Sequence, residues 1–171
     1  MQATHRDAEE RYTRIRKAVL DEVNKELFNS QRQLQAKLIN QTALVQSDSW
    51  KYSEKRRVDW EWVEGYHSFK FRYPKRFEMA LWHNSTLVSL SLGRPTYQGT
   101  KLRLDFIEGN PDKPKDIKVF EYTFLAMAGY AHAMGANELR VMNPINTEVK
   151  SYYESFGLSY IAKGDYLYVR L

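Results

Sequence analysis

The sequence has no cysteine. Disulfides, thiolate nucleophiles and cysteine metal sites are therefore excluded together. Long apolar runs are also missing, since none approaches the roughly 20 residues that a membrane-spanning helix requires. The first ten residues are polar and charged, without the apolar segment of a signal peptide. We therefore expect a cytoplasmic protein with no membrane partner.

The composition is that of a folded domain. A chain of 171 residues with 43% hydrophobic and 27% charged residues suits one packed domain rather than long disorder. The net charge is +5, but basic residues alternate with acidic ones except in Lys55-Arg56-Arg57 and around Pro114. This distribution disfavours nucleic acid as the partner, and it equally suits a polyphosphate ligand or an acidic partner.

The amino-terminal part predicts helices. From residue 7 to residue 28, apolar positions recur every four residues, at Ile15, Val19, Val23 and Leu27. Asn29-Ser30 can end this helix and cap a second one, on which Leu34, Leu38 and Ile39 share a face. The two pieces form either one bent helix or a hairpin. A polar stretch at 46–53 then predicts the boundary between a helical segment, 1–46, and a domain, 47–171.

An aromatic stretch follows this boundary. Residues 58–71 carry two tryptophans, a tyrosine and two phenylalanines in a mixed pattern that favours a helix but also fits an irregular strand. Tyr73-Pro74 ends it, because a residue before proline is pushed toward extended conformations.

The rest of the chain predicts an α+β fold with a mixed sheet flanked by helices. Three strand candidates, at 77–83, 87–92 and 102–107, follow one another as an antiparallel meander. An amphipathic helix at 117–134 ends at Gly135, which is a natural carboxyl-terminal cap. A strand at 139–142, a helix at 146–156 and strands at 158–161 and 166–171 complete the pattern.

The segment NPINTEVKSYYESFGLSY, residues 143–160, resembles the last conserved block of the GNAT superfamily of acyl-CoA-dependent N-acyltransferases. The residues that match at the family's spacing are Asn146, Val149, Tyr153, Glu154, Gly157 and Leu158, the last standing where phenylalanine is usual. The order of elements from 77 to 171 is also similar to the GNAT core. The resemblance therefore implies acetyl-CoA, or another acyl-CoA, as cosubstrate and an amine as acceptor.

The resemblance also implies where that cosubstrate binds. In GNAT proteins the third meander strand separates from the strand after the long helix, and pantetheine pairs with its exposed backbone, which corresponds here to Phe106 and Ile107. Asn146 begins the helix beside this slot and is a further expected contact with the cofactor. Tyr153 is the expected proton donor, because a phenol with a pKa near 10 can protonate a thiolate whose conjugate acid has a pKa near 8.5. The alternative is that Tyr153 only packs.

The phosphate-binding loop departs from the family pattern. The positions of the signature Arg/Gln-x-x-Gly-x-Gly/Ala fall on Lys113, Asp116 and Lys118, and no glycine occurs between Asn110 and Tyr122. Glycine normally lets backbone amides approach the phosphates. Either Lys113, Lys115 and Lys118 replace that contact by charge pairing, or the site has decayed.

A base for the attacking amine is sought at the end of the third meander strand. Glu108 is the first candidate, acting directly or through water as acidic residues do in several GNAT enzymes, and Asp105 is the second. The alternative is that Glu108 is merely a solvated carboxylate beside Gly109. The four histidines are dispersed without metal-ligand spacing, so no metal site is expected.

We therefore expect an N-acyltransferase in which the amine attacks the thioester directly, with no covalent enzyme intermediate. The acidic and aromatic residues at 59–66 favour a cationic acceptor. A second hypothesis is a catalytically silent GNAT-like domain that binds a protein, or a second copy of itself, through its amino-terminal helices. A third is nucleic-acid binding by the basic clusters, which predicts a steep salt dependence.

Overall fold

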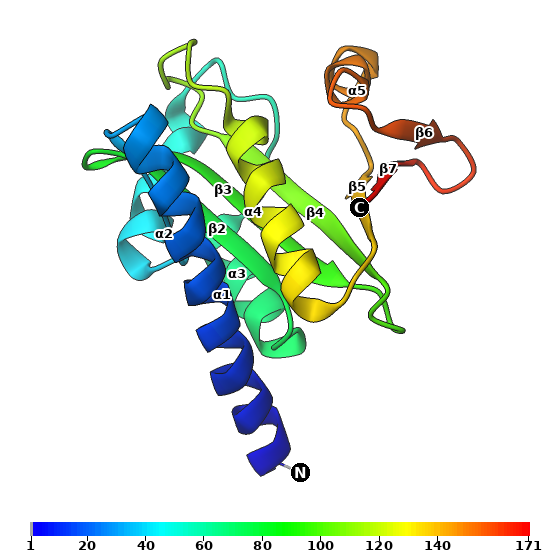
Figure 1. Cartoon of the computed structure of the whole chain (residues 1–171). Coiled ribbons are helices and arrows are strands. Elements are labelled where there is room, and N and C mark those ends of the chain that lie inside the picture. The colour runs from blue at the N-terminus through cyan, green and yellow to red at the C-terminus, as the bar shows by residue number, and fades with distance from the viewer. Residues whose placement is uncertain (1) are drawn as a thin grey trace.

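A seven-stranded mixed sheet forms the centre of the computed structural model, which describes residues 2–171 (Figure 1). In spatial order the strands are β1 (Leu34–Lys37), β2 (Phe77–His83), β3 (Thr86–Pro95), β4 (Lys101–Gly109), β5 (Glu138–Met142), β7 (Tyr166–Arg170) and β6 (Ser159–Ile161). Only β4 and β5 pair in parallel, and the other neighbours are antiparallel. The predicted mixed α+β sheet is confirmed.

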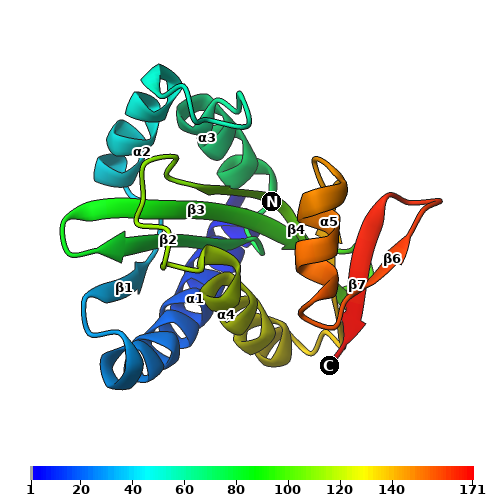
Figure 2. The ribbon, with the colours of Figure 1, turned by 90° about the horizontal axis from the view of Figure 1, so that it is seen from above.

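Helices cover both faces of the sheet. They are α1 (Gln2–Ser30), α2 (Gln41–Asp48), α3 (Trp62–Arg72), α4 (Val119–Met134) and α5 (Thr147–Glu154), with a short 3-10 helix, η1 (Ser49–Tyr52), after α2. Figure 2 shows α1 and α4 beneath one face and α2 and α3 above the other. Each face has its own apolar core, one containing Leu27, Phe77 and Met127 and the other Leu44, Trp62 and Leu90.

The amino-terminal part differs from the sequence prediction in one respect. The predicted helix at 7–28 is confirmed as part of α1, whose Leu20, Val23 and Leu27 are buried in the core. The second helix predicted around Leu34 is wrong, because residues 34–37 form β1 and pair with β2. Every second side chain of β1 is buried, as in a strand with one face on the core. In four residues this alternation repeats only twice, which is too few repeats to recognise from the sequence.

The later elements agree with the prediction. The helix favoured at 58–71 is confirmed as α3, although it begins only at Trp62. The meander, the long helix, the following strand, the short helix and the two closing strands are all present. Gly135 caps α4 with a left-handed backbone at φ 80°, a conformation that glycine adopts without strain.

Buried charged groups join α1 to the other elements. Arg76 donates hydrogen bonds to Glu9 of α1 at 2.8 and 2.9 Å and to Glu78 of β2 at 2.8 Å. Glu78 also accepts hydrogen bonds from the Tyr66 hydroxyl of α3 and the Ile39 amide. Because Arg76 and Glu78 are each only 2% exposed, these pairs fix α1 and α3 relative to the sheet.

A β-bulge interrupts the pairing of β3 with β4. Leu92 lies opposite Phe106 while its neighbour Gly93 lies opposite Leu104, so Asp105 is an extra residue in β4. A bulge reverses the alternation of side chains beyond it. Leu104 therefore faces the core on the α4 side, whereas Phe106 faces α3. In a regular strand Leu104 and Phe106 would lie on the same face of the sheet, but here they lie on opposite faces.

Among residues 2–171, no helix is long and apolar enough to cross a membrane.

We predict that Gly93→Ala disrupts this bulge. A Cβ at position 93 would lie 2.2 Å from the carbonyl oxygen of Arg103, so the backbone of one strand would have to move. Overpacking of this kind costs about 1–3 kcal/mol, and backbone atoms yield less readily than side chains, so we expect a loss of unfolding free energy of about 3 kcal/mol in urea titration.

The matched control for this change is Gly65→Ala. A Cβ there meets nothing within 4 Å, and Gly65 lies inside α3, so alanine should raise stability by about 0.5–1 kcal/mol. Equal stability of the Gly93→Ala and wild-type proteins would contradict the close approach of the strands at the bulge.

Candidate functional site

The separation of β4 from β5 creates the first part of the site. The two strands pair from Lys101 and Glu138 to Leu104 and Val141, and within residues 2–171 no strand pairs with that edge of β4 over Asp105–Gly109. The chain leaves β5 at Asn143, which has a left-handed backbone with φ 49° and whose amide donates to Asp165. The predicted slot between the two strands is therefore present.

A cavity of about 140 Å³ lies in this slot and is called the wedge cavity here. Its walls come from the ends of both strands, from α5 and from the loop before α3. The lining residues are Arg57, Val58, Trp60, Leu104, Asp105, Ile107, Val141, Met142, Asn143, Pro144, Ile145, Val149 and Tyr153. Arg57, Val58 and Trp60 place the loop at 53–61 along one side of the slot.

Tyr153 reaches the wedge cavity from α5. Its ring packs on Phe120 of α4 with 4.5 Å between centroids, and the residue is 8% exposed. Burial, together with the neighbouring Tyr152, raises the pKa of Tyr153 to about 12. The phenol therefore stays protonated at neutral pH, while the same rise makes it a weaker acid toward the departing thiolate. The predicted role in acid catalysis remains a prediction, with the side chain in a suitable place.

Phe106 and Ile107 lie on opposite faces of β4. Ile107 lines the wedge cavity, and its place beside the pantetheine arm stays a prediction. Phe106 faces α3, with its ring centroid 5.2 Å from that of Trp60. The backbone between these two residues belongs to the unpaired edge of β4, so the predicted contact with pantetheine concerns backbone groups rather than the Phe106 ring.

Glu108 is a buried hydrogen-bonding centre rather than a solvated carboxylate. Arg56 donates to both of its oxygens, at 2.8 and 3.1 Å, and the Trp62 indole donates at 2.7 Å. Hydrogen bonding to Glu108 raises the pKa of Arg56 above its ordinary value. Arg56 in turn donates to the carbonyl oxygen of Trp60. These donors occupy three of the roughly four acceptor positions of the carboxylate, and its role as the base stays a prediction.

Arg56 is a residue of the site that sequence reasoning missed. Arg56 belongs to the basic run Lys55-Arg56-Arg57, which suggested a charged surface, but its side chain is only 11% exposed. Lys55 of the same run lies 3.9 Å from Asp112. Only the pairing of Arg56 with an acid 52 residues away distinguishes it from its neighbours, and nothing in the local sequence indicates that pairing.

Asp105, the second candidate base, is paired with arginines. Arg103 contacts its carboxylate at 2.6 Å, and Arg94 lies 3.7 Å away. Burial nevertheless raises the pKa of Asp105, because it outweighs the charges of the two arginines. Asp105 and Tyr153 both line the wedge cavity, whereas the two arginines paired with the Asp105 carboxylate, Arg94 and Arg103, do not.

The loop before α4 carries the three predicted phosphate-binding lysines. Lys113 bends inward, donates to the Ile117 carbonyl at 2.9 Å and has a pKa lowered by burial. Lys115 and Lys118 are exposed. Lys118 is the N-cap of α4 and makes no side-chain capping hydrogen bond, so the first amides of the helix have no side-chain acceptor there. Free amides beside two lysines fit an anionic group.

Asn146 has a structural contact that the sequence pattern did not require. Its side-chain oxygen accepts a hydrogen bond from the Val149 amide at 2.8 Å and caps α5. An asparagine is favoured at this position for that reason alone. Its predicted contact with the cofactor stays a prediction and would involve the amide group of the side chain, which is exposed.

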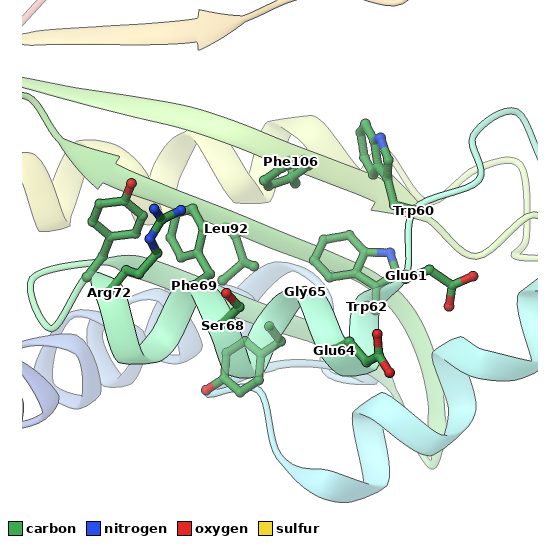
Figure 3. A pocket seen from close by; sticks show the side chains of 12 residues that line it. Trp60, Glu61, Trp62, Glu64, Gly65, Ser68, Phe69, Arg72, Leu92 and Phe106 are labelled. Carbon is green, nitrogen blue, oxygen red and sulfur yellow. The ribbon is translucent and has the colours of Figure 1, made fainter.

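A larger cavity, called the aromatic pocket here, lies on the opposite face of β4 between α3 and the sheet (Figure 3). Its volume is about 490 Å³, within the range of small-molecule sites. The lining residues are Trp60, Glu61, Trp62, Glu64, Gly65, Tyr66, Ser68, Phe69, Arg72, Tyr73, Leu92 and Phe106. Trp60 also lines the wedge cavity, so the two cavities adjoin at this side chain.

No protein-family model and no curated protein sequence matches this chain. Solved structures do resemble it. A mutant of spermidine N-acetyltransferase SpeG from Vibrio cholerae matches with a TM-score of 0.61 and 11% identity, over 81% of this chain and 94% of that one. An acetyltransferase from Streptococcus agalactiae matches with a TM-score of 0.61 and 13% identity, over 80% and 96%.

PaiA N-acetyltransferase from Thermoplasma acidophilum, solved in complex with coenzyme A, matches with a TM-score of 0.56 and 14% identity, over 81% of this chain and 99% of that one. At these identities the likeness establishes the fold. The protein has the fold of the GNAT acetyltransferases, as the resemblance of residues 143–160 implied.

We predict that Glu108→Gln destabilises the protein and loosens the loop at 53–61. The change leaves the buried Arg56 guanidinium without its anionic partner, so we expect a loss of about 3–5 kcal/mol in unfolding free energy. Hydrogen exchange of the amides at 53–61 should become faster than in the wild type.

Asp112→Asn is the matched control, because Asp112 also contacts this loop, through the exposed Lys55. An exposed pair contributes about 0–1 kcal/mol, so the control should change little. If both variants lost the same stability, Glu108 would not be the anchor of the loop.

Proposed function

We propose that the protein is an N-acyltransferase that transfers an acetyl group from acetyl-CoA to an amine by direct attack, in the cytoplasm. The observation that carries this proposal is the unpaired edge of β4 facing a cavity that Tyr153 borders. Such an edge offers backbone donors and acceptors to an extended chain, and pantetheine is a chain of that kind. The fold of known acetyltransferases supports the proposal.

Different groups in and near the slot would polarise the thioester, donate a proton and accept a proton. The amides at the unpaired end of β4 would donate to the thioester oxygen and polarise the carbonyl group. The amine nitrogen then forms the C–N bond while the C–S bond breaks, and Tyr153 gives its proton to the departing thiolate. The amine loses a proton, for which Glu108 is the proposed acceptor through a water molecule, because Glu108 itself lines neither the wedge cavity nor the aromatic pocket.

The phosphates of acetyl-CoA would lie at the amino terminus of α4. Lys115 and Lys118 are exposed beside the first amides of this helix. Their positive charges would bind the phosphates in place of the backbone amides that a glycine-rich loop presents. Asp116 lies in the same loop and opposes them. Binding should therefore depend on the lysines more strongly, and on salt more steeply, than in a loop that uses amides alone.

A second candidate, a protein-binding module without catalysis, has one observation in its favour. A cavity of about 570 Å³ lies between α1 and α4, lined by apolar residues such as Val19, Leu125 and Ala128. A homodimer or a protein partner could use this surface. Because Leu20, Val23 and Leu27 of α1 belong to the core, deletion of α1 would unfold the protein, and the enzymatic test is the better discriminator.

We predict that acetyl-CoA binds in isothermal titration calorimetry and that Lys118→Gln raises its Kd about threefold to fivefold, the effect of one exposed ion pair. Raising the salt concentration should reduce this difference. Lys163→Gln is the matched control, since Lys163 is equally exposed but lies in the turn between β6 and β7. No binding at millimolar acetyl-CoA would defeat the proposal.

We predict that Tyr153→Phe lowers kcat about 100-fold at unchanged Kd for acetyl-CoA, because the phenol is removed and the ring that packs on Phe120 is kept. Tyr152→Phe is the control, as Tyr152 is a neighbouring and more exposed phenol outside the wedge cavity. Since the pKa of Tyr153 is raised to about 12, the wild-type rate should show no loss from phenol ionisation below about pH 11. Equal rates for the two variants would remove Tyr153 from the mechanism.

A further inference from the structure

The aromatic pocket adjoins the proposed reaction centre at Trp60. Trp60 lines both this pocket and the wedge cavity, and Phe106 lies beside Trp60 on β4. A molecule in the pocket would therefore place the group nearest Trp60 at the slot, and the rest of the molecule would extend along α3 (Figure 3). The side chains and charges that line the pocket along α3 therefore indicate the chemistry of the rest of the bound molecule.

The walls of the pocket are shaped by rings. Trp60, Trp62 and Phe69 lie nearly perpendicular to Phe106, at 81°, 74° and 80°, with centroids 5.2 to 6.5 Å away. Phe106 is 36% exposed, a high value for a ring within such a cluster. Rings prefer edge-to-face and offset contacts, so this wall suits a flat apolar or aromatic body.

Charges stand at the two ends of the pocket with opposite sign. Glu61 and Glu64 lie at the amino-terminal end of α3, near Trp62, and Arg72 lies at the other end (Figure 3). All three side chains are exposed, and none belongs to an ion pair within residues 2–171. Glu64 and Arg72 are eight residues apart, which is about 12 Å along a helix axis.

These charges distinguish between kinds of amine. The carboxylates lie at the end where the amino group must arrive, so they attract it. Arg72 would repel the second ammonium group of an extended polyamine, and it would attract a carboxylate at the same distance. A simple alkylamine would use neither the rings nor Arg72.

We propose that the acceptor is an amine joined by an aromatic or similarly flat body to an anionic group, such as a carboxylate. This inference rests on the proposed function and specifies its substrate. The amino group lies between Glu61, Glu64 and the slot, the flat body contacts Phe106 and its neighbouring rings, and the anionic group pairs with Arg72. Acetylation leaves the body and the anionic group unchanged, because only the amine nitrogen forms a bond.

The test uses acetyl-CoA as the acyl donor and compares three acceptors: 4-(2-aminoethyl)benzoate, 2-phenylethylamine and spermidine. The benzoate should have a kcat/KM about fivefold above that of phenylethylamine, the effect of one partly exposed ion pair, and the difference should lie in KM. Spermidine should be the poorest. Arg72→Gln should abolish the difference between the kcat/KM values for the benzoate and for phenylethylamine by raising the KM for the benzoate.

Lys70→Gln is the matched control. Lys70 is another exposed cation in the last turn of α3, but it does not line the pocket. Both cations suit the negative end of the helix dipole, so a role of Arg72 in helix stability alone would give the two variants the same effect. That result, or a wild-type enzyme that prefers phenylethylamine or spermidine, overturns the proposal.

A binding measurement separates this inference from the proposed function. In the protein labelled with ¹⁵N, 4-(2-aminoethyl)benzoate should shift the indole signals of Trp60 and Trp62 and leave those of Trp50 and Trp82 unchanged, because only the first two line the pocket. If it binds in this way, with a dependence on Arg72, but no acetyl transfer occurs, the ligand class stands and the acyltransferase proposal fails. If transfer to amines occurs without dependence on Arg72, the acyltransferase proposal stands and the ligand class fails.

Discussion

The extra residue in β4 is the constraint on which the candidate site depends. Asp105 has no partner in β3, so the strand reverses its alternation at this point and parts from β5 one residue after their last pair. Without the bulge, Phe106 and Glu108 would face α4, and the aromatic pocket would lose one wall. Gly93 permits the bulge because any side chain there would meet the Arg103 carbonyl. One local irregularity thus opens the slot and directs both side chains toward α3.

Glu108 extends this constraint to the loop before α3. Through Arg56 it holds the carbonyl of Trp60, and through the Trp62 indole it holds the first residue of α3. Trp60 is consequently fixed between the wedge cavity and the aromatic pocket. A charge buried at a strand end is costly unless it is fully paired, and here its three donors all come from the segment that separates the two cavities. The carboxylate therefore has a clear structural role, whether or not it also handles a proton.

Elements with a long periodic pattern are predicted well from the sequence. Features that depend on pairing with a distant segment are predicted poorly. The meander at 77–107, the long helix ending at Gly135 and the motif from Asn146 to Gly157 were all predicted, because each carries its own period, cap or spacing. β1 was mistaken for a helix, since Leu34 and Leu38 also have helical spacing and only β2 supplies the register. The partners of Glu108 could not be predicted, because Arg56 lies 52 residues away within a basic run.

The amino-terminal helix α1 is connected to the aromatic pocket by a series of hydrogen-bonded side chains. Glu9 of α1 binds Arg76, Arg76 binds Glu78, and Glu78 accepts from Tyr66, whose ring lines the aromatic pocket. Because Arg76 and Glu78 are almost fully buried, a shift of α1 would either break a charged hydrogen bond or move Tyr66. The helix that precedes the first strand is thus tied to the pocket wall by side chains from three elements. It contributes to the shape of the proposed acceptor site without touching it.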